Sequence, residues 1–124
     1  MKKSLSAVTA ALVLLIGAAT ANAHTVLVYS NPKSGAIVHS LPNSITLRFA
    51  EPLLTLAGQT INRVSVTDPK GVVVTSGKNI SRGTLLTNAF NSVVAKKGIY
   101  KVSYRVSAQD GHVVIGSFTF TLKN

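Results

Sequence analysis

The sequence predicts an all-β fold, a two-sheet Greek-key sandwich of seven strands. Apolar residues occupy every second position in several segments, and turn-forming residues separate those segments. Ile45, Leu47 and Phe49 alternate with polar residues, and residues 99–107 and 113–122 repeat the pattern. This alternation gives a strand one face for a core and one face for water, as in antiparallel sheets. After residue 23, no segment of ten residues carries a convincing helical pattern.

The expected strands are short, and Pro, Gly, Asn and Asp mark their ends. They lie near residues 25–30, 45–50, 60–67, 71–76, 84–90, 99–107 and 113–122. The motif Asp68-Pro69-Lys70-Gly71 predicts a tight turn, so that Val64–Asp68 and Val72–Ser76 form a hairpin. The segment Pro52–Thr60 is expected to cross between the sheets. Seven short strands in about 100 residues are typical of a sandwich.

Composition limits the functions that the chain can have. Its 124 residues suffice for one domain. The absence of cysteine excludes disulfides and thiolate metal sites. Only Glu51, Asp68 and Asp110 carry carboxylate side chains, which is a poor supply for an enzyme that needs several acid–base groups. Because 46% of the residues are apolar and 13% are charged, a disordered chain is not expected.

The first 23 residues have the three parts of a secretory signal peptide. Lys2 and Lys3 precede an apolar segment, Ala10–Ala19, and Ala21-Asn22-Ala23 supplies small residues for cleavage. We expect cleavage after Ala23, which leaves one domain over residues 24–124 with a formal charge of +8, from eleven basic and three acidic residues. An uncleaved membrane anchor is the alternative, but the strongly apolar core is short. The cleaved chain would not be embedded in a membrane.

The candidate metal ligands are histidines and carboxylates. Cleavage would make His24 the N-terminal residue, whose amine and ring nitrogen can chelate one metal ion. Because both nitrogens must be deprotonated to bind the metal, acid should weaken metal binding. Asp110 and His112 would converge if the chain there is extended. Alternatively, Asp110 only forms a hairpin turn by bonding its own backbone. His39 is expected in a surface loop. Glu51 is either solvated surface or a hydrogen-bond acceptor for a ligating histidine.

Three blocks of residues occur in order behind the signal segment. They are His24-x-x-Leu27-x-x-Ser30-x-Pro32-x-x-Gly35; then Pro42-x-x-Ile45-x-Leu47-x-Phe49-Ala50-Glu51; then Gly98-x-Tyr100-x-Val102-x-Tyr104-Arg105-Val106 with Asp110-Gly111-His112 and Gly116-x-Phe118-x-Phe120. In these blocks the sequence resembles the CopC copper-resistance family of periplasmic copper-binding proteins. The resemblance covers nearly the whole of residues 24–124.

The resemblance implies a Greek-key sandwich of the cupredoxin-like or immunoglobulin-like type. It also implies a periplasmic protein for copper resistance or homeostasis that holds one Cu(II) per chain. The implied ligands are the amine and ring of His24, the ring of His112, and Asp110, with Glu51 at an acidic position close to the site. Such a protein sequesters copper or hands it to a membrane partner, of which a CopD-like copper transporter is the family example, and it is not an enzyme.

The chemistry of the implied ligands agrees with Cu(II). Three nitrogens and a carboxylate favour a tetragonal Cu(II) centre, and Cu(II) binds such ligands more tightly than Zn(II). The only methionine is Met1, which leaves with the signal segment, so a sulfur-lined Cu(I) site is excluded. The sequence departs from the family at Tyr104, where Trp is usual, and at Ala108, where Ser is usual. These departures affect packing near the site rather than the ligands.

Three other functions remain open from the sequence. A terminal histidine also builds the copper site of polysaccharide monooxygenases, although this chain is short and has no Trp for sugar rings. A structural sandwich without metal would leave both histidines as bystanders. The basic charge suggests a polyanion binder, but aromatic residues are too sparse to favour nucleic acid, and the basic residues are spread along the chain.

Overall fold

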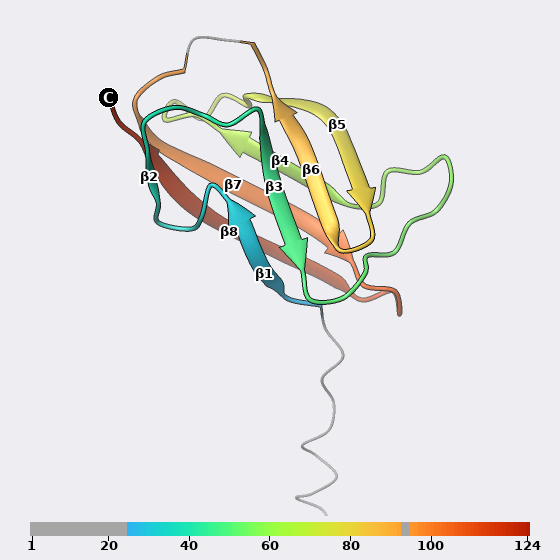
Figure 1. Ribbon diagram of the computed structural model, residues 1–124. Helices are drawn as coiled ribbons and strands as arrows, with labels where there is room; N and C mark the ends of the chain where they lie inside the picture. The colour runs from blue at the N-terminus through green and yellow to red at the C-terminus, as the bar shows by residue number, and fades with distance from the viewer. Residues whose placement is uncertain (1–24, 93–94) are drawn as a thin grey trace, which may run out of the picture.

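The computed structural model describes residues 25–92 and 95–124, and these form strands and turns. The expected signal segment, residues 1–23, and His24 lie outside the described residues. The strands are β1 (Leu27–Asn31), β2 (Ile37–Val38), β3 (Ser44–Phe49), β4 (Arg63–Thr67), β5 (Thr75–Arg82), β6 (Leu85–Phe90), β7 (Gly98–Ser107) and β8 (Val113–Leu122). Figure 1 shows their arrangement. In the part of the chain that is described, no helix is long and apolar enough to cross a membrane.

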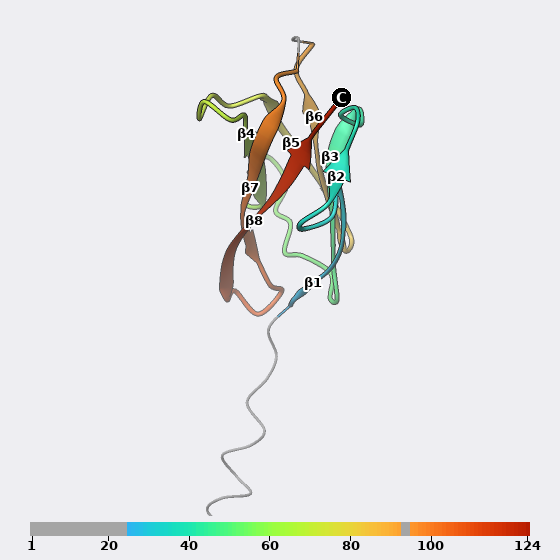
Figure 2. The same cartoon turned by 90° about the vertical axis from the view of Figure 1, so that its left-hand side faces the viewer.

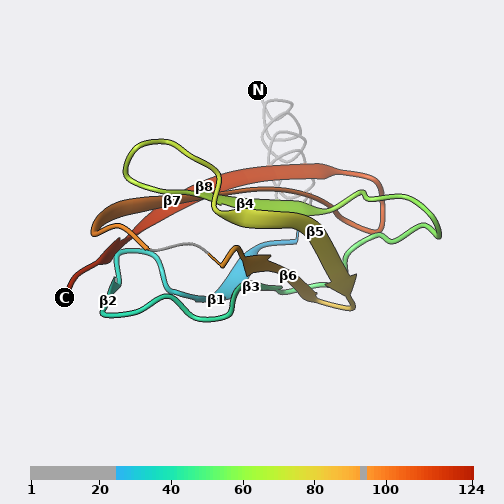
Figure 3. The same ribbon diagram turned by 90° about the horizontal axis from the view of Figure 1, so that it is seen from above.

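The strands form two four-stranded sheets that pack face to face. One sheet has the order β1-β3-β6-β5 and the other has the order β2-β8-β7-β4. Figures 2 and 3 show the two layers from the side and from above. The hairpins β5–β6 and β7–β8 stay within one sheet, whereas every other connection takes the chain from one sheet to the other. The predicted all-β sandwich is confirmed, and the segment Pro52–Thr60 lies in the connection that crosses between the sheets.

The core lies between the sheets and consists of the apolar faces that the alternation predicted. Ile45, Leu47 and Phe49 of β3 are fully buried, and Val102 and Val106 of β7 face them from the other sheet. The Tyr100 and Phe120 rings stack with their centroids 5.3 Å apart. Because inward and outward residues alternate along a strand, these buried positions direct the polar residues of β3 and β7 to solvent.

Two expectations about the strands are wrong in detail. The structure has eight strands, because Ile37–Val38 adds a two-residue parallel pairing with the end of β8 that is too short to produce a sequence pattern. The expected strand near 71–76 is displaced, since β5 covers Thr75–Arg82 and pairs with β6. Most side chains of β5 are exposed, so this edge strand lacks the apolar alternation by which the others were recognised.

The turn Asp68–Gly71 forms as predicted, but the hairpin around it is short. The N–H of Asp68 donates to the carbonyl of Val72 at 2.8 Å, and one isolated bridge joins Thr67 to Val73 before the chain leaves for the other sheet. The Oδ1 of Asp68 accepts hydrogen bonds from the backbone N–H groups of Lys70 and Val72. The Val72 N–H makes the largest contribution to lowering the pKa of the Asp68 carboxyl, and burial opposes it.

Candidate metal centre

The β7–β8 hairpin ends in a tight turn that carries Asp110 and His112. The N–H of Ala108 donates to the carbonyl of His112 at 2.8 Å, and the N–H of Gly111 donates to the carbonyl of Ala108 at 2.9 Å. Gly111 has a φ of +93°, a conformation that side chains rarely adopt, so glycine suits this position. Asp110 Oδ1 accepts the backbone N–H of His112 at 3.0 Å. The turn therefore holds the two side chains next to each other.

Asp110 and His112 form a close pair in this turn. Asp110 Oδ2 lies 2.7 Å from His112 Nδ1, and the side chains of His112 and Asp110 are 61% and 41% exposed. When the proton is on Nδ1, this contact is a hydrogen bond that leaves the lone pair on Nε2. Metal-binding histidines commonly donate their second ring N–H to a carboxylate in this way, which fixes the ring and makes it more basic. The residues present fit a histidine that binds metal through Nε2.

The convergence that the sequence predicted is confirmed, but its physical origin differs from the expectation. The chain at residues 110–111 is a turn rather than an extended segment, and the carboxylate bonds the backbone as well as the imidazole. The expected hairpin turn and the expected proximity of the two side chains therefore occur together. Asp110 is a turn residue through Oδ1 and a histidine partner through Oδ2.

The start of the described chain is fixed at the same end of the sandwich. Thr25 is only 1% exposed, and its Oγ1 lies 3.2 Å from the N–H of Glu51, which donates to it, and 3.3 Å from the carbonyl of Glu51. The N–H of Ala50 donates to the carbonyl of Val26 at 2.8 Å. Figures 1 and 2 show that the start of β1 and the β7–β8 turn lie at one end, opposite the C-terminus.

The segment that follows β3 connects Thr25 with the β7–β8 turn. Two residues beyond Glu51, Leu53 forms an antiparallel bridge with Ala108, and the N–H of Leu54 donates to the carbonyl of Ser107 at 2.9 Å. Thr25 contacts one end of this segment and the turn contacts the other end. One short stretch of backbone thus sets the position of the chain start relative to Asp110.

Asn62 secures this arrangement from inside the sandwich. The side chain is 3% exposed; its Nδ2 donates to the carbonyl of Leu54 at 2.8 Å and to Ser81 Oγ at 3.0 Å. Its Oδ1 accepts the N–H of Ser107 at 2.9 Å. Sequence reasoning missed this residue, because Asn62 fell inside the strand expected near 60–67 and no local pattern marked its amide as buried. A buried amide that satisfies two backbone groups can be recognised only in the folded chain.

The other candidate residues are Glu51, His39 and His24. Glu51 has an exposed side chain, and only its backbone contacts Thr25. His39 is exposed and follows β2, which pairs with the C-terminal end of β8, so it lies at the opposite end of that strand from His112. Among residues 25–92 and 95–124, no three His, Asp or Glu side chains are grouped so that they could hold a metal ion. His24, the remaining expected ligand, lies outside the described residues.

The two departures from the resembled family lie on β7 and at its end, and both are packed into the sandwich. The Tyr104 ring meets Phe49 edge to face, with the ring centroids 5.5 Å apart. It lies across Gly116, its partner on β8, so closely that a Cβ at Gly116 would overlap the phenol ring. Ala108 is buried. Both residues therefore take part in the packing of the sandwich.

Comparison with known proteins agrees with this fold. Residues 27–123 match the family model of the CopC domain. A protein described as copper resistance protein C, from Xanthomonas campestris pv. juglandis, is 30% identical over an alignment of 126 positions that covers 87% of each chain. The crystal structure of CopC from Methylosinus trichosporium OB3b matches with a TM-score of 0.65 and 27% identity, over 81% of this chain and 94% of that one.

A second solved structure supports the fold alone. PcoC, a methionine-rich copper resistance protein from Escherichia coli, matches with a TM-score of 0.64 and 24% identity, over 82% of this chain and 100% of that one. The present sequence contains one methionine, Met1, and so differs from that protein in composition.

Proposed function

Because the chain belongs to the CopC family, we propose that it is a periplasmic Cu(II)-binding protein for copper resistance and homeostasis. It acts by binding rather than by catalysis, and it either sequesters copper or delivers it to a CopD-like transporter in the inner membrane. Cleavage after Ala23 releases residues 24–124 as the working domain.

The Asp110–His112 pair is the observation that carries this proposal. A carboxylate 2.7 Å from Nδ1 orients the imidazole and directs its Nε2 toward a ligand. The anchored Thr25 supports the second half of the site, since it fixes the chain immediately after the expected N-terminal residue. We propose that one Cu(II) per chain binds the amine and ring of His24 and the ring of His112, with Asp110 beside them and Glu51 at the edge.

The donor set explains the preference for Cu(II). The amine and the two imidazole nitrogens suit a tetragonal ion, and Cu(II) exceeds the other divalent first-row metals in affinity for such ligands. The negative charge of Asp110 also offsets the repulsion that a cation meets at a chain with a formal charge of +8. No cysteine is present to bind softer metals.

The decisive experiment compares two forms of the domain, one that begins at His24 and one with a single glycine added ahead of it. Each is titrated with Cu(II) and examined by electron paramagnetic resonance. We expect tight one-to-one tetragonal binding by the first form and much weaker binding by the second, because the glycine separates the terminal amine from the His24 ring. Equal binding by the two forms would remove the amine from the ligand set, and no binding by either would refute the copper function.

Replacing Asp110 with asparagine tests the pair itself. Asparagine keeps an oxygen for the backbone N–H of His112 but loses the charge that orients the ring. Removing such a partner typically lowers metal affinity about ten- to a hundredfold. Asp68→Asn is the matched control, because it removes the same charge from a turn at the other end of β4 and β7. An Asp110→Asn form that binds Cu(II) like the control would contradict the role of this carboxylate.

A further inference from the structure

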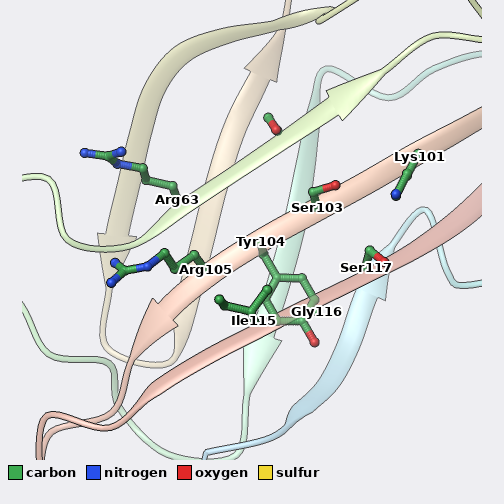
Figure 4. A pocket seen from close by; sticks show the side chains of 9 residues that line it. Arg63, Lys101, Ser103, Tyr104, Arg105, Ile115, Gly116 and Ser117 are labelled. Carbon is green, nitrogen blue, oxygen red and sulfur yellow. The ribbon is translucent and has the colours of Figure 1, made fainter. Parts of the chain in front are cut away.

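A groove of about 580 Å³ lies on the outer face of the sheet that contains β4, β7 and β8. Strand register arranges its residues in rows across the three strands. Ser65, Ser103 and Ser117 form the middle row, and Arg63 and Arg105 lie opposite each other in the row nearer the β7–β8 turn. Figure 4 shows both arginine side chains extending together to one side of the row of serines.

The remaining walls of the groove differ in chemistry. Lys101 lies on the far side of the serine row, between Thr67 and Thr119. Ile115 continues the arginine row and is 75% exposed, more than any other large apolar side chain among the described residues. The groove is therefore lined by the three serine hydroxyls together with Gly116 and the ring of Tyr104, and three cations and one exposed apolar side chain surround them.

The charges at this groove are not neutralised by the protein. The Cβ atoms of directly opposed residues in an antiparallel pair lie about 5 Å apart, and like charges in such a pair destabilise the sheet. Within residues 25–92 and 95–124, no ion pair joins Arg63, Arg105 or Lys101 to a carboxylate. An anionic ligand between the two guanidinium groups would relieve this repulsion and form charge-assisted hydrogen bonds.

The dimensions of the groove indicate an elongated ligand. Lys101 and Arg105 are four residues apart on β7, about 13 Å along a strand. A single phosphate cannot contact both ends of this row of cations. An extended peptide can place one acidic side chain at the arginine pair and another at Lys101, while its backbone accepts hydrogen bonds from the serines between them.

We propose that this groove binds an extended acidic segment of a partner protein. Two acidic positions separated by about three residues contact the cations, and an apolar side chain of the partner packs on Ile115. This interaction does not depend on copper, because none of the groove residues belongs to the candidate metal centre. The basic residues are scattered in the sequence, and only the register of β4 with β7 brings Arg63 next to Arg105.

The test measures binding of a rhodamine-labelled peptide by fluorescence anisotropy at low ionic strength. The peptide carries glutamate pairs at its two ends, separated by three serines, and a second peptide carries glutamine in their place. The Arg63→Ser/Arg105→Ser form is compared with Lys33→Ser/Lys70→Ser, which loses the same charge from exposed loops outside the groove. We expect the first pair of changes to weaken binding at least about tenfold and the second to change it less than about twofold.

Ser103→Glu provides an independent variant that keeps every cation. A carboxylate in the middle of the serine row occupies the groove and should abolish peptide binding, while thermal melts confirm that the exposed substitutions leave each form folded. Equal weakening by the two double substitutions would overturn the proposal in favour of general charge attraction. Binding of the glutamine peptide, unchanged binding by the Ser103→Glu form, or arginine-dependent binding of phosphatidylglycerol vesicles without peptide binding would also overturn it.

Discussion

Replacing Asn62 with alanine removes the hydrogen bonds that hold the connection after β3 against the end of β7. Alanine leaves two backbone groups without their partner, the carbonyl of Leu54 and the N–H of Ser107, whereas Ser81 can turn toward water. Each buried polar group left unsatisfied costs about 1–3 kcal/mol. The two together predict a loss of about 2–6 kcal/mol in the free energy of unfolding. In a domain of about 100 residues, even the lower figure lowers Tm by roughly 8–16 °C.

Urea and thermal unfolding of residues 24–124, with a chelator present so that bound metal does not add stability, measure this loss. Asn43→Ala is the matched control, because Asn43 is exposed and its side chain forms no hydrogen bond among the described residues. That substitution should change stability by less than about 0.5 kcal/mol. If Asn62→Ala unfolds at the same urea concentration as the control, the hydrogen bonds of Asn62 do not stabilise the connection and the reasoning fails.

Two further substitutions test local features of the fold. Gly116→Ala should destabilise the domain by about 1–3 kcal/mol, because the added Cβ would overlap the Tyr104 ring. Urea unfolding should show a smaller loss of stability when the same substitution is made in the Tyr104→Val protein. Equal losses in the two proteins would exclude this overlap as the cause. Asp68→Asn should reduce the acid sensitivity of Tm. The hydrogen bond from Val72 lowers the folded pKa of Asp68, so this stabilisation is present above the unfolded pKa and is lost as pH falls through the folded value. Thermal melts of the original protein and the Asp68→Asn form are compared from neutral pH to below pH 4. The same dependence of Tm on pH in both would contradict this role of Asp68.

Much of the sandwich could be predicted because burial leaves a period of two in the sequence. The pattern of Ile45, Leu47 and Phe49 identified β3, and all three residues are buried as expected. The residues 77–82 of β5 have no such pattern, because an edge strand that is exposed on most of its length is not constrained by a core. Sequence periodicity therefore reports contact with the core rather than strand conformation itself.

The candidate site was predictable only where its residues are close in sequence. Asp110 and His112 are two positions apart, so any tight turn brings them near each other, and the structure confirms the pairing. The groove on the outer face of β4, β7 and β8 depends on the pairing of Arg63 with Arg105, which are far apart in the sequence. Long-range register follows from the topology of the whole sandwich, and no local pattern contains it.

The anchoring of Thr25 has a consequence for the proposed cleavage after Ala23. A buried residue tied to Glu51 cannot slide to compensate for an error in the cleavage position. Each residue gained or lost displaces the new terminus by about 3.8 Å, almost twice the length of a bond between a metal and nitrogen. Accuracy to a single peptide bond during export is therefore a requirement of the proposed copper chemistry, and a heterogeneous terminus would divide a preparation into binding and non-binding molecules.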